Sequence, residues 1–221
     1  MKRGVAADHF NKALTSSEQL LLGLLKTPAS FQIFLDSLAY ASETLYRSPL
    51  SVLHERTCQC FDGAVFAAAM LHRLGHPALI LNLLPNSRDD DHVLALFQKN
   101  GHWGAVAKSN FSGLRFREPV YRDLRELVMS YFEHYYNLHR EKTLRGYTRP
   151  LDLKTFDHLL WMTDDETMHH IAEKLDRGTR YGILTQEMVR GLSLIDDRSC
   201  SAGLHGANKA GLSKPPQPKN S

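Results

Sequence analysis

Apolar residues in the first fifty positions recur with the 3.6-residue period of amphipathic helices. Thr15 to Glu18 match a capping box ahead of the apolar run Leu20–Leu25, so a helix is predicted to begin there. A second helix is predicted from Thr27-Pro28 to about Tyr46, because proline is tolerated in a first helical turn. Its apolar stripe consists of Phe31, Phe34, Leu35 and Leu38.

The middle of the chain changes from a helical to an extended pattern. An alanine-rich stretch from about Cys60 to Leu74 predicts a third helix, and Gly75 suits its C-terminal cap. After Pro77, the continuous apolar run Ala78–Leu84 predicts a buried strand.

A β-hairpin follows an acidic turn, Asp89-Asp90-Asp91. Asn100-Gly101 is a strong signal for a two-residue hairpin loop, and it joins a strand that begins at His92 to a strand that ends near Ala107. Because side chains alternate between faces, the two-residue loop also fixes the register. The predicted pairs are Lys99 with His102, Gln98 with Trp103, Leu94 with Ala107, and His92 with Ser109.

The remainder of the chain is predicted to be helical, over about 121–138, 153–175 and 185–194. From Ser201 onward, small residues and prolines predict a disordered tail. The fold class expected from this order is α+β: a thiol-bearing helix on an antiparallel sheet with extra helices at both ends. The expected divisions are a helical segment (1–56), a core (57–112), a helical extension (113–200) and the tail (201–221).

Composition narrows the function classes. A chain of 221 residues with 43% hydrophobic residues fits a single ordinary domain. A formal charge of +3 is too small to indicate a nucleic-acid or membrane partner. Cys58 and Cys60 are too close in sequence to form a disulfide comfortably, which leaves free thiols and favours a reducing cytoplasm.

The candidate chemistry is a thiol and an imidazole. Cys60 stands at the start of a predicted helix, where unpaired N–H groups favour a thiolate. His92 begins the hairpin and is a candidate base for that thiol. On its own, a cysteine at the start of a helix is more often a small buried residue than a nucleophile.

The order of motifs resembles the transglutaminase-like superfamily. The segments that carry the resemblance are Cys60 to Ala64 (Cys-Phe-Asp-Gly-Ala), Leu74 to Ala78 (Leu-Gly-His-Pro-Ala), an apolar strand, His92, and Gly101-His102-Trp103. The resemblance covers about a quarter of the chain. It implies a papain-like fold, with the cysteine on a central helix and the histidine on a neighbouring sheet.

The resemblance also implies catalytic roles: Cys60 as nucleophile and His92 as general base. The family's third residue, an aspartate, falls on Ala107, which cannot accept the second imidazole N–H. Ser109, opposite His92 in the predicted register, is one candidate to orient the ring, and Asn110 is another if a local bulge turns it inward.

Other clusters have simpler interpretations. Asp62, in the first helical turn, favours the helix dipole, and Asp89 to Asp91 fit a solvated turn. Cys60 lies about 18 Å by helix rise from His72 and His76, so a shared metal site is rejected. The basic and aromatic segment 115–149 is interpreted as structural rather than as a nucleic-acid surface, although Arg115 and Arg117 remain candidates to line a substrate groove.

The sequence therefore predicts a cytoplasmic, transglutaminase-like thiol enzyme that cleaves or transfers an amide or peptide bond through a Cys60 thioester. A protein or peptide substrate is expected, with no cofactor, no metal and no membrane partner. The alternative is a catalytically inactive transglutaminase-like scaffold that acts as a protein-interaction module. The acid missing at Ala107 favours that alternative.

Overall fold

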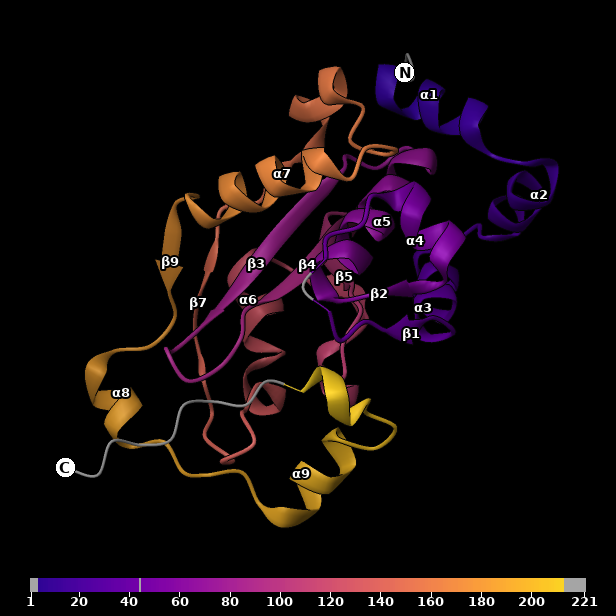
Figure 1. Cartoon of the computed structure of the whole chain (residues 1–221). Helices are drawn as coiled ribbons and strands as arrows, with labels where there is room; N and C mark the ends of the chain where they lie inside the picture. Colours follow the sequence, from indigo (N-terminus) through magenta and orange to yellow (C-terminus); the bar gives the residue numbers. More distant parts are fainter. Residues whose placement is uncertain (1–3, 44, 213–221) are drawn as a thin grey trace.

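The computed structural model describes residues 4–43 and 45–212, and its centre is helix α5 (Cys60–Arg73) packed on an antiparallel sheet (Figure 1). The sheet has the order β6-β5-β4-β3-β7-β9, and β8 pairs with the start of β3. A short parallel pair, β1 (Ala39–Tyr40) and β2 (Thr57–Cys58), lies apart from it. The strands of the sheet are β3 (Leu79–Pro85), β4 (His92–Lys99), β5 (His102–Val106), β6 (Arg117–Tyr121), β7 (Leu144–Thr148), β8 (Leu151–Asp152) and β9 (Arg180–Gly182).

Helices cover both faces of this sheet, so the fold is α+β. The other α-helices are α1 (Val5–Ala13), α2 (Ser16–Leu24), α3 (Pro28–Asp36), α4 (Pro49–Glu55), α6 (Leu124–Met129), α7 (Glu166–Asp176), α8 (Gln186–Arg190) and α9 (Asp197–Gly203). The 3₁₀ turns are η1 (Ser112–Leu114), η2 (Phe132–His134), η3 (Leu153–Leu159) and η4 (Lys209–Gly211).

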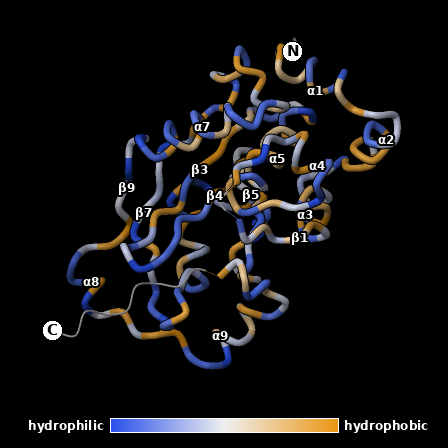
Figure 2. The backbone as a smooth tube through the Cα atoms, in the orientation of Figure 1, coloured by the Kyte–Doolittle hydropathy of each residue, from blue (hydrophilic) through white to orange (hydrophobic). Residues whose placement is uncertain are grey.

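The two faces of β4 bury two different clusters. Val93 and Ala95 pack with the residues of α5, whereas Leu94 and Leu96 pack with α6 and η2. In Figure 2 the tube is hydrophobic along β3 and largely hydrophilic along α7, which contacts β3. The direction of each β4 side chain therefore decides which layer it meets.

Helix α5 is rich in alanine because it is buried on all sides. Its residues from Phe61 to Leu71 are all buried. The carboxylate of Asp62 accepts hydrogen bonds from the backbone N–H groups of Gln59 at 3.2 Å and Arg47 at 3.0 Å, so Asp62 caps the helix start. Gly75, with a φ of 94°, ends the helix in the left-handed conformation, as predicted.

The predicted hairpin is confirmed. Asn100 and Gly101 have positive φ values of 52° and 78°, as the predicted two-residue turn requires. Strand β5 ends at Val106, so the predicted pairs Leu94–Ala107 and His92–Ser109 are not part of the ladder. The ladder pairs Lys99 with His102 and Gln98 with Trp103, as predicted.

Several predicted helices were wrong in extent. The helix predicted to run to about Tyr46 ends at Asp36, and β1 follows it. The helix predicted over 121–138 is reduced to α6 and the turn η2. The segment 113–200, predicted to be helical, supplies β6 to β9 to the central sheet as well as helices. Burial against the sheet therefore outweighs the helical spacing of its apolar residues.

The tail prediction was wrong for residues 201–212. Helix α9 and η4 occupy this segment, and Asn208 hydrogen-bonds with Asn110 and with the carbonyl of Tyr40. Residues 213–221, also predicted to be disordered, lie outside the described residues.

A buried glutamine joins α3 to the segment after β5. The side chain of Gln32 donates to the carbonyl of Ala107 at 3.0 Å and accepts from its N–H at 3.1 Å. The neighbouring Lys108 reaches past Gly63 and donates to the carbonyls of Leu35 and Leu38 at the end of α3. These contacts satisfy backbone groups that no sheet partner reaches.

We expect Gln32→Ala to lower the free energy of unfolding by about 2–3 kcal/mol, because it leaves both buried backbone groups of Ala107 without a partner. Urea denaturation measures the loss. Gln186→Ala, on the exposed surface of α8, is the matched control and is expected to change stability by less than about 0.5 kcal/mol. Equal losses in the two variants would contradict the role of Gln32.

Candidate active site

Cys60 is the first residue of α5 and is partly exposed. Its thiol faces the backbone carbonyl of Asp91 at 4.0 Å, just before β4. Burial raises the pKa of the Cys60 thiol to about 12, even though the backbone N–H groups of Val93 and Phe61 act in the opposite direction. The resting sulfur is therefore a neutral thiol.

His92 is the first residue of β4 and is buried. Its Nε2 atom lies 2.7 Å from the backbone carbonyl of Leu114. A carbonyl only accepts, so Nε2 carries the proton and Nδ1 of the neutral ring is left as an acceptor. Burial lowers the pKa of His92 to about 4, against the opposing effect of the Leu114 carbonyl.

The structure brings the thiol to the backbone next to His92 rather than to its ring. Asp91, whose carbonyl faces the thiol, directly precedes His92 in sequence. The imidazole packs against Tyr135 with ring centroids 6.4 Å apart. Within the described chain, no hydrogen bond joins the Cys60 thiol to the His92 ring. In this state the ring faces the layer of Leu114 and Tyr135, whereas Val93, on the other face of β4, packs with α5, so the thiol and the imidazole are not a bonded pair.

The residues considered for the third position lie elsewhere. Ala107 is buried and its backbone is held by Gln32. Ser109 accepts a hydrogen bond from the N–H of Phe111, and the Asn110 side chain donates to the carbonyls of Asn208 and Gly211. Among the described residues, the group that hydrogen-bonds the His92 ring is the Leu114 carbonyl.

Sequence reasoning missed a tyrosine next to the thiol. The backbone N–H of Cys60 faces the hydroxyl of Tyr40 closely enough to lower its pKa, although burial raises that pKa overall. In thiol enzymes, a backbone N–H at the nucleophile can donate to the oxyanion that forms on the substrate. Tyr40 comes from β1, twenty residues before Cys60, and no spacing rule connects the two positions.

A second missed residue is Asn82 on β3. Its side-chain amide donates to the carboxylate of Asp91, and its Oδ1 atom is buried without a hydrogen-bond partner within the described residues. Desolvation raises the pKa of Asp91, and the hydrogen bond from Asn82 opposes the shift. The carbonyl that the thiol faces thus belongs to a residue whose carboxylate is part of a buried polar pair.

A polar cavity of about 300 Å³ adjoins the segment after β5. Tyr40, Ser109, Asn110 and Arg115 line it, and Arg115 is paired there with Asp36 at 3.1 Å. Arg117, the other candidate for a groove, instead stacks over the buried ring of Tyr131 at 3.9 Å and has a structural role.

The carboxylate of Asp62, near the site, accepts hydrogen bonds from backbone N–H groups. Burial raises the pKa of Asp62 to about 7, opposed by the backbone N–H groups that it caps. Cys58 is buried, which raises its pKa to about 12.

In residues 4–43 and 45–212, no group of three or more histidine, cysteine, aspartate or glutamate side chains is placed to hold a metal ion. No helix in this described part is long and apolar enough to cross a membrane.

Comparison with known proteins gives only a distant likeness. No family model and no curated protein matches the sequence. A solved structure of LapG from Legionella pneumophila is 15% identical, with a TM-score of 0.34 over 48% of this chain and 71% of that chain. EGTA-treated LapG from the same organism is 13% identical, with a TM-score of 0.40 over 75% of this chain and 98% of that chain. Likeness at this level carries no conclusion about activity.

The buried imidazole predicts an acid-dependent loss of stability. Its pKa is about 4 in the folded state and 6.5 as a model value, so the unfolded state binds more protons between these pH values. The stabilisation is present above pH 6.5 and is lost as pH falls through about 4. It amounts to about 3 kcal/mol.

We expect His92→Gln, which keeps a donor near the position of Nε2, to remove this part of the pH dependence. The measurement is the free energy of unfolding of both proteins in urea between pH 7 and pH 4. Parallel curves for wild type and variant would show that the ring titrates normally in the folded protein.

Proposed function

We propose that the protein is a thiol enzyme that acts on an amide or peptide bond through a thioester at Cys60, with His92 as the base. The observation that carries the proposal is the hydrogen bond from His92 Nε2 to the Leu114 carbonyl. It fixes the tautomer in which Nδ1 accepts a proton, one residue from the backbone that the Cys60 thiol contacts. A backbone carbonyl thus supports the ring where the resembling family has an aspartate.

The proposed chemistry starts from two neutral groups. On substrate binding, His92 Nδ1 takes the thiol proton while the sulfur attacks the carbonyl carbon of the amide. The imidazolium then returns the proton to the amine as the carbon–nitrogen bond breaks, which leaves a thioester on Cys60. Water completes hydrolysis, and an amine in its place completes acyl transfer.

Two features of the resting site must change for this reaction. The His92 ring must move into reach of the thiol, because the two are not bonded at rest. The Tyr40 hydroxyl must leave the Cys60 N–H, so that this N–H can donate to the oxyanion that forms on the substrate. The Leu114 carbonyl supports the imidazolium by its dipole alone, so we expect turnover to be slower than with a carboxylate.

A protein or peptide is the proposed substrate. The cavity beside Tyr40 is lined by polar groups, among them Ser109, Asn110 and the paired Arg115, whose present hydrogen bonds within the protein a bound chain would replace. Such groups suit the amide groups of an extended chain.

A second candidate function is a scaffold that does not catalyse. The thiol pKa of about 12 and the imidazole pKa of about 4 favour it, because both disfavour the thiolate–imidazolium pair. On this alternative the fold acts in protein interaction, and Cys60 is a partly exposed but inert residue.

Alkylation of Cys60 by iodoacetamide between pH 5 and 8 separates the two functions. If His92 takes the thiol proton, neither group changes protonation in this range, so the rate is expected to be nearly independent of pH. An unassisted thiol of high pKa instead reacts about tenfold faster per pH unit, because the thiolate fraction rises tenfold. Mass spectrometry of the Cys60 peptide measures the rate.

The variants make the result specific. His92→Gln is expected to slow alkylation at pH 6 by about 100-fold and to restore the steep pH dependence. Cys58→Ser, which removes the buried neighbouring thiol, is the matched control and is expected to leave the profile unchanged. A steep profile in the wild-type protein that His92→Gln does not alter would favour the scaffold.

A further inference from the structure

A cavity of about 500 Å³ lies between the C-terminal half of α7 and the chain on either side of β8. None of its lining residues belongs to the candidate active site. Its apolar part comes from Leu151, the half-buried ring of Phe156 and the buried Leu175. Its size lies within the range of small-molecule sites, about 300–1,000 Å³.

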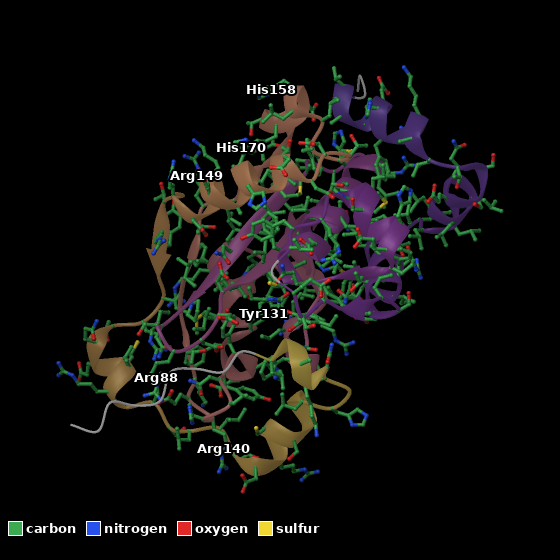
Figure 3. The ribbon with its side chains drawn as sticks, viewed as in Figure 1. Arg88, Tyr131, Arg140, Arg149, His158 and His170 are labelled. Carbon is green, nitrogen blue, oxygen red and sulfur yellow. The ribbon has the colours of Figure 1, made fainter. Side chains whose placement is uncertain are left out.

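The rim of this cavity carries positive charge without matching negative charge. Arg149 and Lys174 line it, and the side chain of neither has a hydrogen bond or ion pair within residues 4–43 and 45–212. Figure 3 shows Arg149 and His170 next to each other on this side of the molecule, and His170 also lines the cavity. The one lining carboxylate, Glu173, is offset by Arg177 at 3.4 Å.

Packing alone explains only part of this arrangement. Lys174 stands in the last turn of α7, where a cation favours the helix dipole. Arg149 has no such role, because it follows β7 and only its backbone is bonded, to Thr179. Several other arginines of this protein are paired with carboxylates, as Arg47, Arg88 and Arg140 are, whereas the exposed side chains of Arg190 and Arg198 have no hydrogen bond or ion pair within the described residues. What distinguishes Arg149 is its place on the rim of the cavity beside Lys174, where its free guanidinium can meet a ligand.

We propose that this cavity binds a small organic phosphate, with its phosphate on Arg149 and Lys174 and its apolar part against Phe156. A phosphate monoester carries about 1.5–2 negative charges at pH 7, which matches the two unpaired cations. Its oxygens accept from the guanidinium fork and the ammonium, while His170 supplies a further polar group. The apolar floor selects esters with a hydrophobic or aromatic portion over inorganic phosphate.

Calorimetric titration of the whole protein with phenyl phosphate, inorganic phosphate and phenol tests both halves of the proposal. Phenyl phosphate is expected to bind at least tenfold more tightly than either of the others. Arg149→Gln and Lys174→Gln are each expected to weaken it at least fivefold. Phe156→Leu is expected to reduce the preference over inorganic phosphate without changing the affinity for inorganic phosphate.

Arg190→Gln is the matched control, because Arg190 is an exposed arginine on α8 outside the cavity. It is expected to leave binding unchanged. Equal weakening by Arg190→Gln, no binding of phenyl phosphate at millimolar concentration, or tighter binding of duplex DNA than of phenyl phosphate would each overturn the proposal. The cavity residues lie outside the thiol site, so none of these outcomes depends on catalysis by Cys60.

Discussion

The start of a largely buried helix is the constraint on which this structure depends. Helix α5 is buried from Phe61 to Leu71, so the polar groups at its start need partners within the protein. The carboxylate of Asp62 accepts from the N–H of Gln59, the residue just before the helix, and from the N–H of Arg47, and its own burial raises its pKa to about 7. The Arg47 guanidinium, 4.0 Å from Asp62, is held in turn by Glu43 and Glu55. These contacts of Arg47 and Asp62 thus fix where the Cys60 thiol stands.

Sequence patterns predicted the elements whose signals are local. The capping box at Thr15, the cap at Gly75 and the turn at Asn100-Gly101 each depend on a few adjacent residues, and each is present. The failures lie after Gly113, where Tyr131 and Tyr135 have helical spacing but pack onto the sheet from the two ends of the 3₁₀ turn η2. Periodicity identifies a buried face there, but the partner of that face decides how long the helix is.

The sequence predicted the two candidate side chains, Cys60 and His92, but not the groups that surround them. Cys60 and His92 lie at the starts of the predicted helix and strand, because a helix start and a turn both leave sequence signals. The partner of the His92 ring is the backbone carbonyl of Leu114. Every residue has such a carbonyl, so no residue type in the sequence predicts this contact. Tyr40 was missed for a related reason: it reaches the Cys60 N–H through the pairing of β1 with β2, which is a tertiary contact.

The use of a main-chain oxygen beside His92 has a consequence for how this protein can vary. Replacing the Leu114 side chain leaves the backbone carbonyl in place, so point substitutions at Leu114 do not remove its hydrogen bond with His92. Changes in the length or path of the chain between β5 and η1 move that oxygen directly. The positioning of the imidazole is therefore sensitive to insertions and deletions in this loop, and comparatively indifferent to which residues occupy it.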